Sequence, residues 1–103
     1  MIVRIWTGEA FHENAEEFRH YFHEVLMPKF RATEGFIRAE ALERFEKGRI
    51  EFVVISRWDN YDAIRAFAGS PAERAVLEPD IRAALVRFDD TVKHFIHLAE
   101  EKK

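Results

Sequence analysis

Cysteine is missing from the 103-residue chain, and glycine and serine are scarce. Without cysteine the protein has no disulfide, no thiolate metal site and no cysteine nucleophile. The four glycines form neither a G-x-G nor a G-x-x-x-x-G-K pattern, and neither of the two serines stands in G-x-S-x-G. These absences exclude the common phosphate-binding loops and the nucleophile elbow of serine hydrolases.

Charge and hydropathy exclude further classes of protein. Sixteen Lys and Arg against nineteen Asp and Glu give a net charge of −3, whereas a nucleic-acid surface normally needs an excess of basic residues. The apolar run at residues 52–55 is far shorter than the roughly 20 residues that a membrane helix needs. Residues 1–4 lack the features of a signal peptide. We therefore expect a cytoplasmic protein that binds neither nucleic acid nor a membrane.

Aromatic residues are the one excess of this sequence. Ten Phe, two Trp and two Tyr make up 14% of the chain, and 48% of all residues are hydrophobic. This composition supports a substantial core with much buried aromatic surface. No linker, repeat or low-complexity stretch interrupts it, so we expect one domain over residues 1–103.

The periodicity of the sequence predicts four strands and several helices. The strands are expected at residues 2–7, 36–45, 50–58 and 91–99, with Gly8 ending the first and a hairpin turn at 46–49. A first helix begins near residue 12, ends or kinks near Met27 because Pro28 follows, and resumes to about residue 33. A second helix, capped by residue 59 or 60, runs to residue 68, and short helical pieces follow at 72–76 and 79–85.

This order of elements is β-α-β-β-α-β, the signature of the α+β ferredoxin-like fold. In that fold the strands form an antiparallel sheet in the order 4-1-3-2. The first and third expected strands are the most apolar, as central strands should be. The second carries recurrent charges, which are typical of an edge strand that avoids pairing with other chains.

Both crossovers are expected to be right-handed, so both helices cover the same face of the sheet. The other face is then bare although the central strands carry large apolar residues on both sides. Monomers rarely expose such a patch. We expect a homodimer in which two copies pack sheet to sheet through a two-fold axis. The alternative is that residues 72–85 fold across the bare face.

Several segments of the chain resemble the antibiotic biosynthesis monooxygenase domain. The resemblance covers nearly the whole chain and rests on residues 1–6, 28–35, 58–69 and 92–95. It implies a dimeric α/β barrel made of two ferredoxin-like units. It also implies chemistry of two kinds, because some members of the family oxidise polyphenols or quinols with O₂ and no metal, flavin or haem, and others degrade haem.

Three departures from the family's haem-degrading branch argue against haem chemistry in this chain. That branch has an Asn on its first strand, and here the first strand has none. It has a Trp late in the second helix and a His about ten residues beyond, where this chain has Phe67 and Leu77. We therefore expect no haem and no other cofactor.

Arg4 and Trp6 are candidate site residues because they share one face of a central strand. A buried Arg is costly unless it is paired. In the functional interpretation, Trp6 stacks on a planar substrate and Arg4 acts in catalysis by holding a phenolate or carboxylate. In the structural interpretation, Arg4 pairs with a nearby Glu and Trp6 is part of the core. Tyr21 and Phe67 are further candidates for substrate binding, or else pack in the core.

His94 is the candidate general base, because an imidazole titrates near neutral pH. In the alternative interpretation, His94 is a structural residue of the strand whose imidazole hydrogen-bonds a neighbouring residue. His94 and His97 lie on opposite faces of a strand and cannot chelate one metal together. His20 and His23 resemble half of a metal site, but they lie off the apolar stripe of their helix, so we expect a solvated face and no metal.

Together these residues predict a small-molecule cleft in a homodimer. The leading interpretation is a cofactor-independent monooxygenase of small electron-rich aromatic compounds such as phenols, quinols or anthrones. The alternative is a non-catalytic module of the same fold that binds a small molecule or serves a structural role.

Overall fold

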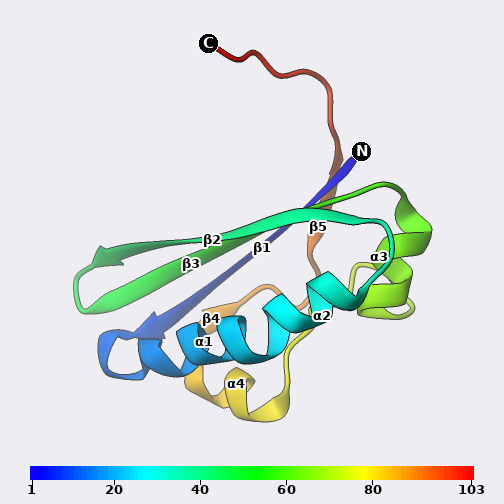
Figure 1. Ribbon diagram of the computed structural model, residues 1–103. Coiled ribbons are helices and arrows are strands. Elements are labelled where there is room, and N and C mark those ends of the chain that lie inside the picture. Colours follow the sequence, from blue (N-terminus) through cyan, green and yellow to red (C-terminus); the bar gives the residue numbers. More distant parts are fainter.

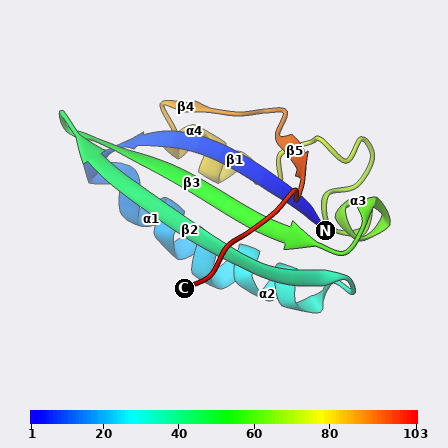
Figure 2. The same ribbon diagram turned by 90° about the horizontal axis from the view of Figure 1, so that it is seen from above.

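The computed structural model describes residues 1–103 as one antiparallel sheet with helices on one side (Figures 1 and 2). Strands β2, β3 and β1 lie in that order, and β4 and β5 both pair with the other edge of β1. The fold is thus ferredoxin-like, and the expected order 4-1-3-2 is confirmed with its fourth strand divided in two. The strands are β1 (Ile2–Phe11), β2 (Phe36–Glu46), β3 (Arg49–Trp58), β4 (Arg87–Phe88) and β5 (Lys93–Ile96).

The helices lie where the periodicity places them, with one exception. Asn60 caps α3 by accepting a hydrogen bond from the backbone N–H of Ala63, as Asn often does at this position. The segment 72–76, expected to be helical, is not; Arg74 instead forms a bridge to Thr91. The helices are η1 (His12–Asn14), α1 (Ala15–Tyr21), η2 (Phe22–Leu26), α2 (Met27–Ala32), α3 (Tyr61–Ala68) and α4 (Pro79–Ala84). None of them is long and apolar enough to cross a bilayer.

The first helix does not stop at Pro28 but widens before it. The Met27 N–H donates to the carbonyl of Phe22, five residues earlier, which makes η2 a π-helical turn. Such turns often absorb an irregularity inside a helix. Pro28 follows in the first turn of α2, so the wider turn lies next to the residue that has no N–H to donate within the helix.

Strand β1 continues past Gly8, where the sequence predicted its end. Gly8 pairs with Phe52 of β3, and pairing extends to Phe11. A side chain at position 8 would collide with the indole of Trp6, because a Cβ there would lie 2.3 Å from Trp6 Cη2. Gly8 therefore makes room for a large aromatic ring that lies along the strand.

The two faces of the sheet follow from the alternation along the central strands. The even-numbered residues of β1 and β3 point toward the helices and are buried there. The odd-numbered residues point to the bare side, which is open above the sheet in Figure 1. The alternative in which residues 72–85 cover that side is wrong, because α4 packs against α1 below the sheet.

Candidate functional site

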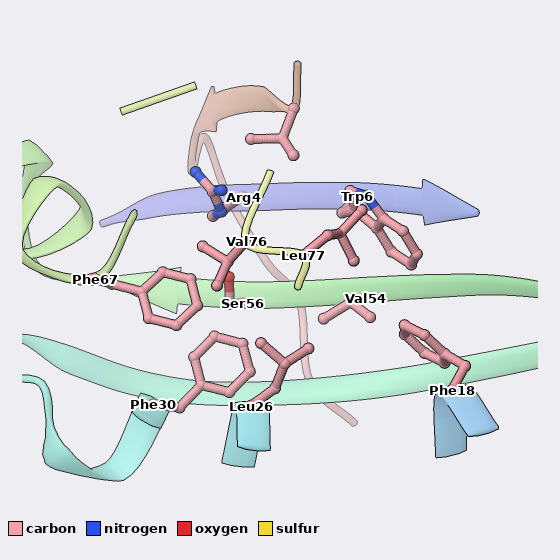
Figure 3. Close-up of a pocket in the computed structure, with 11 residues that line it drawn as sticks. Arg4, Trp6, Phe18, Leu26, Phe30, Val54, Ser56, Phe67, Val76 and Leu77 are labelled. Carbon is pink, nitrogen blue, oxygen red and sulfur yellow. The ribbon is translucent and has the colours of Figure 1, made fainter. Parts of the chain in front are cut away.

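A cavity lies between the covered face of the sheet and the helices (Figure 3). It is narrow, with a cavity volume of about 30 Å³. Nine of its eleven lining residues are hydrophobic. The eleven are Arg4, Trp6, Phe18, Leu26, Phe30, Val54, Ser56, Phe67, Val76, Leu77 and Val92.

Two stacked aromatic pairs stand at opposite ends of this cavity (Figure 3). Trp6 stacks on Phe18 with ring centroids 5.2 Å apart and an interplanar angle of 14°. Phe30 stacks on Phe67 at 4.8 Å and 18°. Rings packed in this way present flat apolar surfaces. Such surfaces favour a planar apolar ligand.

Trp6 is hydrogen-bonded to the segment that joins β4 to β5. Its Nε1 donates to the backbone carbonyl of Asp89 at 3.0 Å. The Asp89 carboxylate in turn accepts hydrogen bonds from the N–H and the hydroxyl of Thr7, at 3.1 and 2.9 Å. The indole N–H is therefore already satisfied, and Trp6 offers a ligand only its apolar ring.

Arg4 is the one charged residue of the cavity lining and is only 4% exposed. Its guanidinium donates to the carbonyls of Ala72 and Arg74, at 2.6 and 2.5 Å. These carbonyls belong to residues 70–78, which we call the strap. Burial lowers the pKa of Arg4 to about 10, against an opposing effect of Glu73. Arg4 is still a cation at neutral pH, and it has no carboxylate bonded to it.

His94 lies directly opposite Arg4 in the register of β1 and β5. Arg4 Nη1 lies 3.0 Å from His94 Nε2, and because a guanidinium can only donate, the imidazole accepts here. Burial and the nearby Arg4 charge lower the pKa of His94, and Glu73 opposes this. His94 is thus a neutral imidazole behind Arg4, and it is not one of the cavity-lining residues.

Tyr21 is buried beside the cavity but is not among the residues that line it. Its hydroxyl donates to the carbonyl of Val76 at 3.0 Å, and burial raises its pKa. Tyr21 therefore fixes the strap from one side as Arg4 does from the other. Of the five candidates from the sequence, the structure brings Arg4, Trp6 and Phe67 to the cavity and puts His94 and Tyr21 one contact away.

Ser56 is a cavity residue that the sequence analysis did not single out. It faces Arg4 across the β1–β3 pair and is 2% exposed. Its Oγ accepts the Nε1–H of Trp58 at 2.9 Å. The signal was available in the sequence, because Ser56 is the one polar residue among the inward-facing positions of β3.

The side chains of the cavity do not suit a haem iron or another metal. None of the eleven lining residues is His, Cys or Met, the side chains that most often ligate haem. Phe67 and Leu77, the two departures from the haem-degrading pattern, both line it. His20 and His23 are exposed, and the structure contains no group of three potential metal ligands.

Comparison with solved structures finds the same fold in several bacterial proteins. A Deinococcus radiodurans protein assigned to the antibiotic biosynthesis monooxygenases has a TM-score of 0.74 and 16% identity, over 100% of this chain and 98% of that chain. SnoaB, a cofactor-independent oxygenase from Streptomyces nogalater, has a TM-score of 0.61 and 22% identity, over 98% and 95%. MhuD with manganese protoporphyrin IX bound has a TM-score of 0.58 and 20% identity, over 100% of both chains.

At these identities the likeness establishes the fold alone, and no curated protein matches the sequence. Membership of a family rests on a separate finding. The family model described as antibiotic biosynthesis monooxygenase matches residues 1–79. That range contains β1, β2 and β3 and most of the cavity lining. The chain belongs to the antibiotic biosynthesis monooxygenase family.

Proposed function

We propose that this protein is a cofactor-independent monooxygenase that acts, as a homodimer, on small electron-rich aromatic compounds such as phenols, quinols or anthrones. The observation that carries the proposal is the buried Arg4 cation in a cavity otherwise lined almost entirely by apolar side chains. A cation in such a place stabilises an anion formed there more strongly than it would in water. An aromatic substrate that becomes an oxyanion would place its ring against the apolar side chains and its negative charge beside Arg4.

The chemistry needs such an anion because triplet O₂ reacts poorly with neutral organic molecules. A deprotonated substrate carbon can transfer an electron to O₂, and the resulting radical pair can combine to a peroxide anion, which takes back the proton first removed and becomes a hydroperoxide. Loss of water then converts a CH₂ group into a ketone, so that CH₂ and O₂ give C=O and H₂O. One oxygen atom enters the product, the other leaves as water, and the substrate supplies all of the electrons.

His94 is the proposed base for the first proton transfer. Its Nε2 accepts a hydrogen bond from Arg4 in this structure. A substrate oxygen that accepts the Arg4 N–H in place of His94 would leave the Nε2 lone pair free to take a proton. The lowered pKa of His94 keeps this base neutral, and so active, at neutral pH. Binding of the substrate and activation of the base are therefore one event in this proposal.

The strap is the proposed route into the cavity. A cavity of about 30 Å³ does not admit a ring system without movement. Val76 and Leu77 of the strap line the cavity, and the strap contains neither helix nor strand. Its hydrogen bonds to Arg4 and Tyr21 would close the site over the substrate and exclude water, as this chemistry requires.

The open face of the sheet is the proposed dimer interface. Ile5, Val53 and Ile55 lie on it only half-buried, and Phe95 is 48% exposed. Arg57 Nε is buried on this side without any hydrogen-bond partner, so an acceptor from a second copy would satisfy it. We expect a standard interface of roughly 1,600 Å² and a particle of twice the 12.2 kDa chain mass.

Oxygen uptake tests the proposed activity. Purified protein is incubated with a panel of phenols, quinols and anthrones, with and without a strong metal chelator. We expect uptake of one O₂ per substrate oxidised, at a rate that the chelator does not change. If no compound is oxidised although several bind, the monooxygenase proposal is contradicted.

A second candidate function is binding without turnover. It is favoured by one observation, namely that Arg4 is already satisfied by two strap carbonyls and His94. An Arg4 whose hydrogen bonds are all made within the protein can hold the strap without taking part in a reaction. The same panel separates the two functions, because a binding protein changes its tryptophan fluorescence with ligand and consumes no oxygen.

A further inference from the structure

The Ser56 hydroxyl is an unused hydrogen-bond donor inside the cavity. Its Oγ accepts from Trp58 Nε1, but no protein atom accepts the hydroxyl hydrogen. Ser56 is 2% exposed, so bulk water does not satisfy this donor either. Leaving a buried donor without an acceptor is costly, which makes Ser56 a group that gains by meeting a ligand.

Ser56 and Arg4 are placed to act on the same atom. They are direct partners in the antiparallel register of β1 and β3, and side chains paired in this way start about 4.5–5.5 Å apart. Figure 3 shows both on the sheet side of the cavity, between the two stacked aromatic pairs. They are the only two polar residues among the eleven that line it.

The chemistry of this pair specifies what it can bind. Arg4 offers donors only, and the free hydrogen of Ser56 makes it a second donor. No carboxylate, amide or imidazole lines the cavity to accept a hydrogen bond from a ligand. The site therefore suits an acceptor oxygen, such as a carbonyl or a phenolate, and disfavours a group that must donate, such as an ammonium.

We propose that Ser56 and Arg4 together bind one acceptor oxygen of an aromatic ligand, and that Ser56 makes the site prefer the ionised phenolate over the neutral phenol. The inference rests on the proposed function, because it takes the cavity to be the ligand site. It adds a specificity residue and a ligand class: flat aromatics with one ketone or phenolate oxygen at an edge. A hydrogen bond to a charged oxygen is stronger than one to a neutral oxygen, so the loss of Ser56 should affect the phenolate most.

The test uses para-nitrophenol, whose phenolate has its own visible absorption. Affinity is measured under argon at one pH above and one pH below the pKa of the free compound. Ser56→Ala should weaken binding of the phenolate about 10-fold or more while changing binding of the neutral form less than about 3-fold. Because no oxygen is present, the result does not depend on whether the protein is an oxygenase.

Two control variants separate the hydroxyl from its neighbours. Trp58→Phe also removes the Trp58–Ser56 hydrogen bond but keeps the Ser56 hydroxyl, and Ser56→Thr keeps the hydroxyl at the same position. Both controls should retain the preference for phenolate, with folding checked by circular dichroism. The inference is overturned if Ser56→Ala binds phenolate as the parent does, if either folded control loses the preference equally, or if the parent protein does not bind the compound.

Failure here is distinguishable from failure of the proposed function. A protein that binds phenolate through Ser56 but consumes no oxygen retains this inference and loses the monooxygenase proposal. A protein that oxidises its substrate equally well with Ser56→Ala retains the activity and loses the role of Ser56.

Discussion

In the cavity on the covered face of the sheet charge is rare and buried, whereas on the open face it is frequent and mostly paired. Arg4 is the one charged side chain in the cavity lining, and its partners are backbone carbonyls and a neutral imidazole. On the open face four cation–carboxylate pairs lie along the strands, namely Arg57–Glu40, Arg44–Glu51, Arg49–Glu9 and Arg87–Glu9.

This difference separates a surface suited to a small molecule from one suited to a protein. A desolvated cation without a carboxylate gains by binding an anion. Exposed ion pairs contribute little to stability, but they orient a partner and keep the surface specific. The same alternation of residues along β1 and β3 therefore produces one face for ligand binding and one face for association. The predictions below test the two faces separately.

The largest effect is expected from the aromatic core of the covered face. Phe18 is 1% exposed and stacks on Trp6, so Phe18→Ala should lower the free energy of unfolding by about 3–5 kcal/mol. Phe45, at the hairpin end of β2, is 62% exposed, and Phe45→Ala should cost less than about 1 kcal/mol. Urea denaturation of both variants makes the comparison. Equal losses would mean that Phe18 is not part of the core.

The second largest effect is expected on the rate of substrate oxidation when Arg4 is replaced. If Arg4 stabilises the developing anion, Arg4→Ala should lower the rate with an active substrate about 10²-fold or more, with the fold and the particle mass unchanged. Arg65→Ala is the matched control, because Arg65 is an exposed arginine of α3 outside the cavity. A folded Arg4→Ala variant that works at the parent rate would assign Arg4 to structure alone.

A charge placed on the open face should break the dimer. Ile55→Glu adds a carboxylate to the centre of the proposed interface, where burial without a partner is costly. We expect association to weaken about 10–100-fold, measured by sedimentation at several concentrations. Glu13→Gln, on an exposed residue of η1, should leave association unchanged. A parent protein that sediments as a single chain would refute the dimer itself.

The smallest expected effect is a dependence of stability on pH caused by His94. Its pKa is lower in the folded state, first by burial and then by the Arg4 charge. Below the ordinary pKa near 6.5, the unfolded chain therefore binds a proton more readily than the folded chain does. Stability should fall as the pH drops from about 7 through this range, and His94→Gln should reduce that slope.

Two comparisons make the pH measurement specific. His20→Gln removes an exposed histidine and should leave the slope as in the parent. The carboxylates of Glu9 and Glu43, whose pKa values are lowered by bonded arginines, lose their contribution only in more acidic solution. A parent slope that His94→Gln does not change would contradict the neutral, partly buried imidazole.

Sequence alone was enough for the architecture of this protein. The alternation of apolar residues identified the central strands, and the order of elements identified the sheet. The same parity put Arg4 and Trp6 on one face, and both line the cavity. These results follow from patterns local to each element, which is why they could be predicted.

Two of the three errors arose where distant segments interact, and the third where two residues of one strand share a face. Gly8 was expected to end a strand, but its role is to accommodate Trp6. The strap was expected to be partly helical, but it is a turn followed by irregular backbone, and its carbonyls accept hydrogen bonds from Arg4 and Tyr21. Ser56 was overlooked because its meaning depends on facing Arg4 across two strands. No local propensity carries this information, because each case depends on what the fold brings next to the residue.

The most direct test of the account is the oxygen-uptake rate of Val54→Phe with a substrate that the parent oxidises. Val54 lines the cavity, and its neighbour Val53 points to the other face of β3. A larger side chain at position 54 should fill the narrow cavity at a cost of about 1–3 kcal/mol in stability. We predict a folded dimer whose uptake falls to the rate without protein. A folded Val54→Phe dimer that consumes oxygen at the parent rate would contradict the assignment of the chemistry to this cavity.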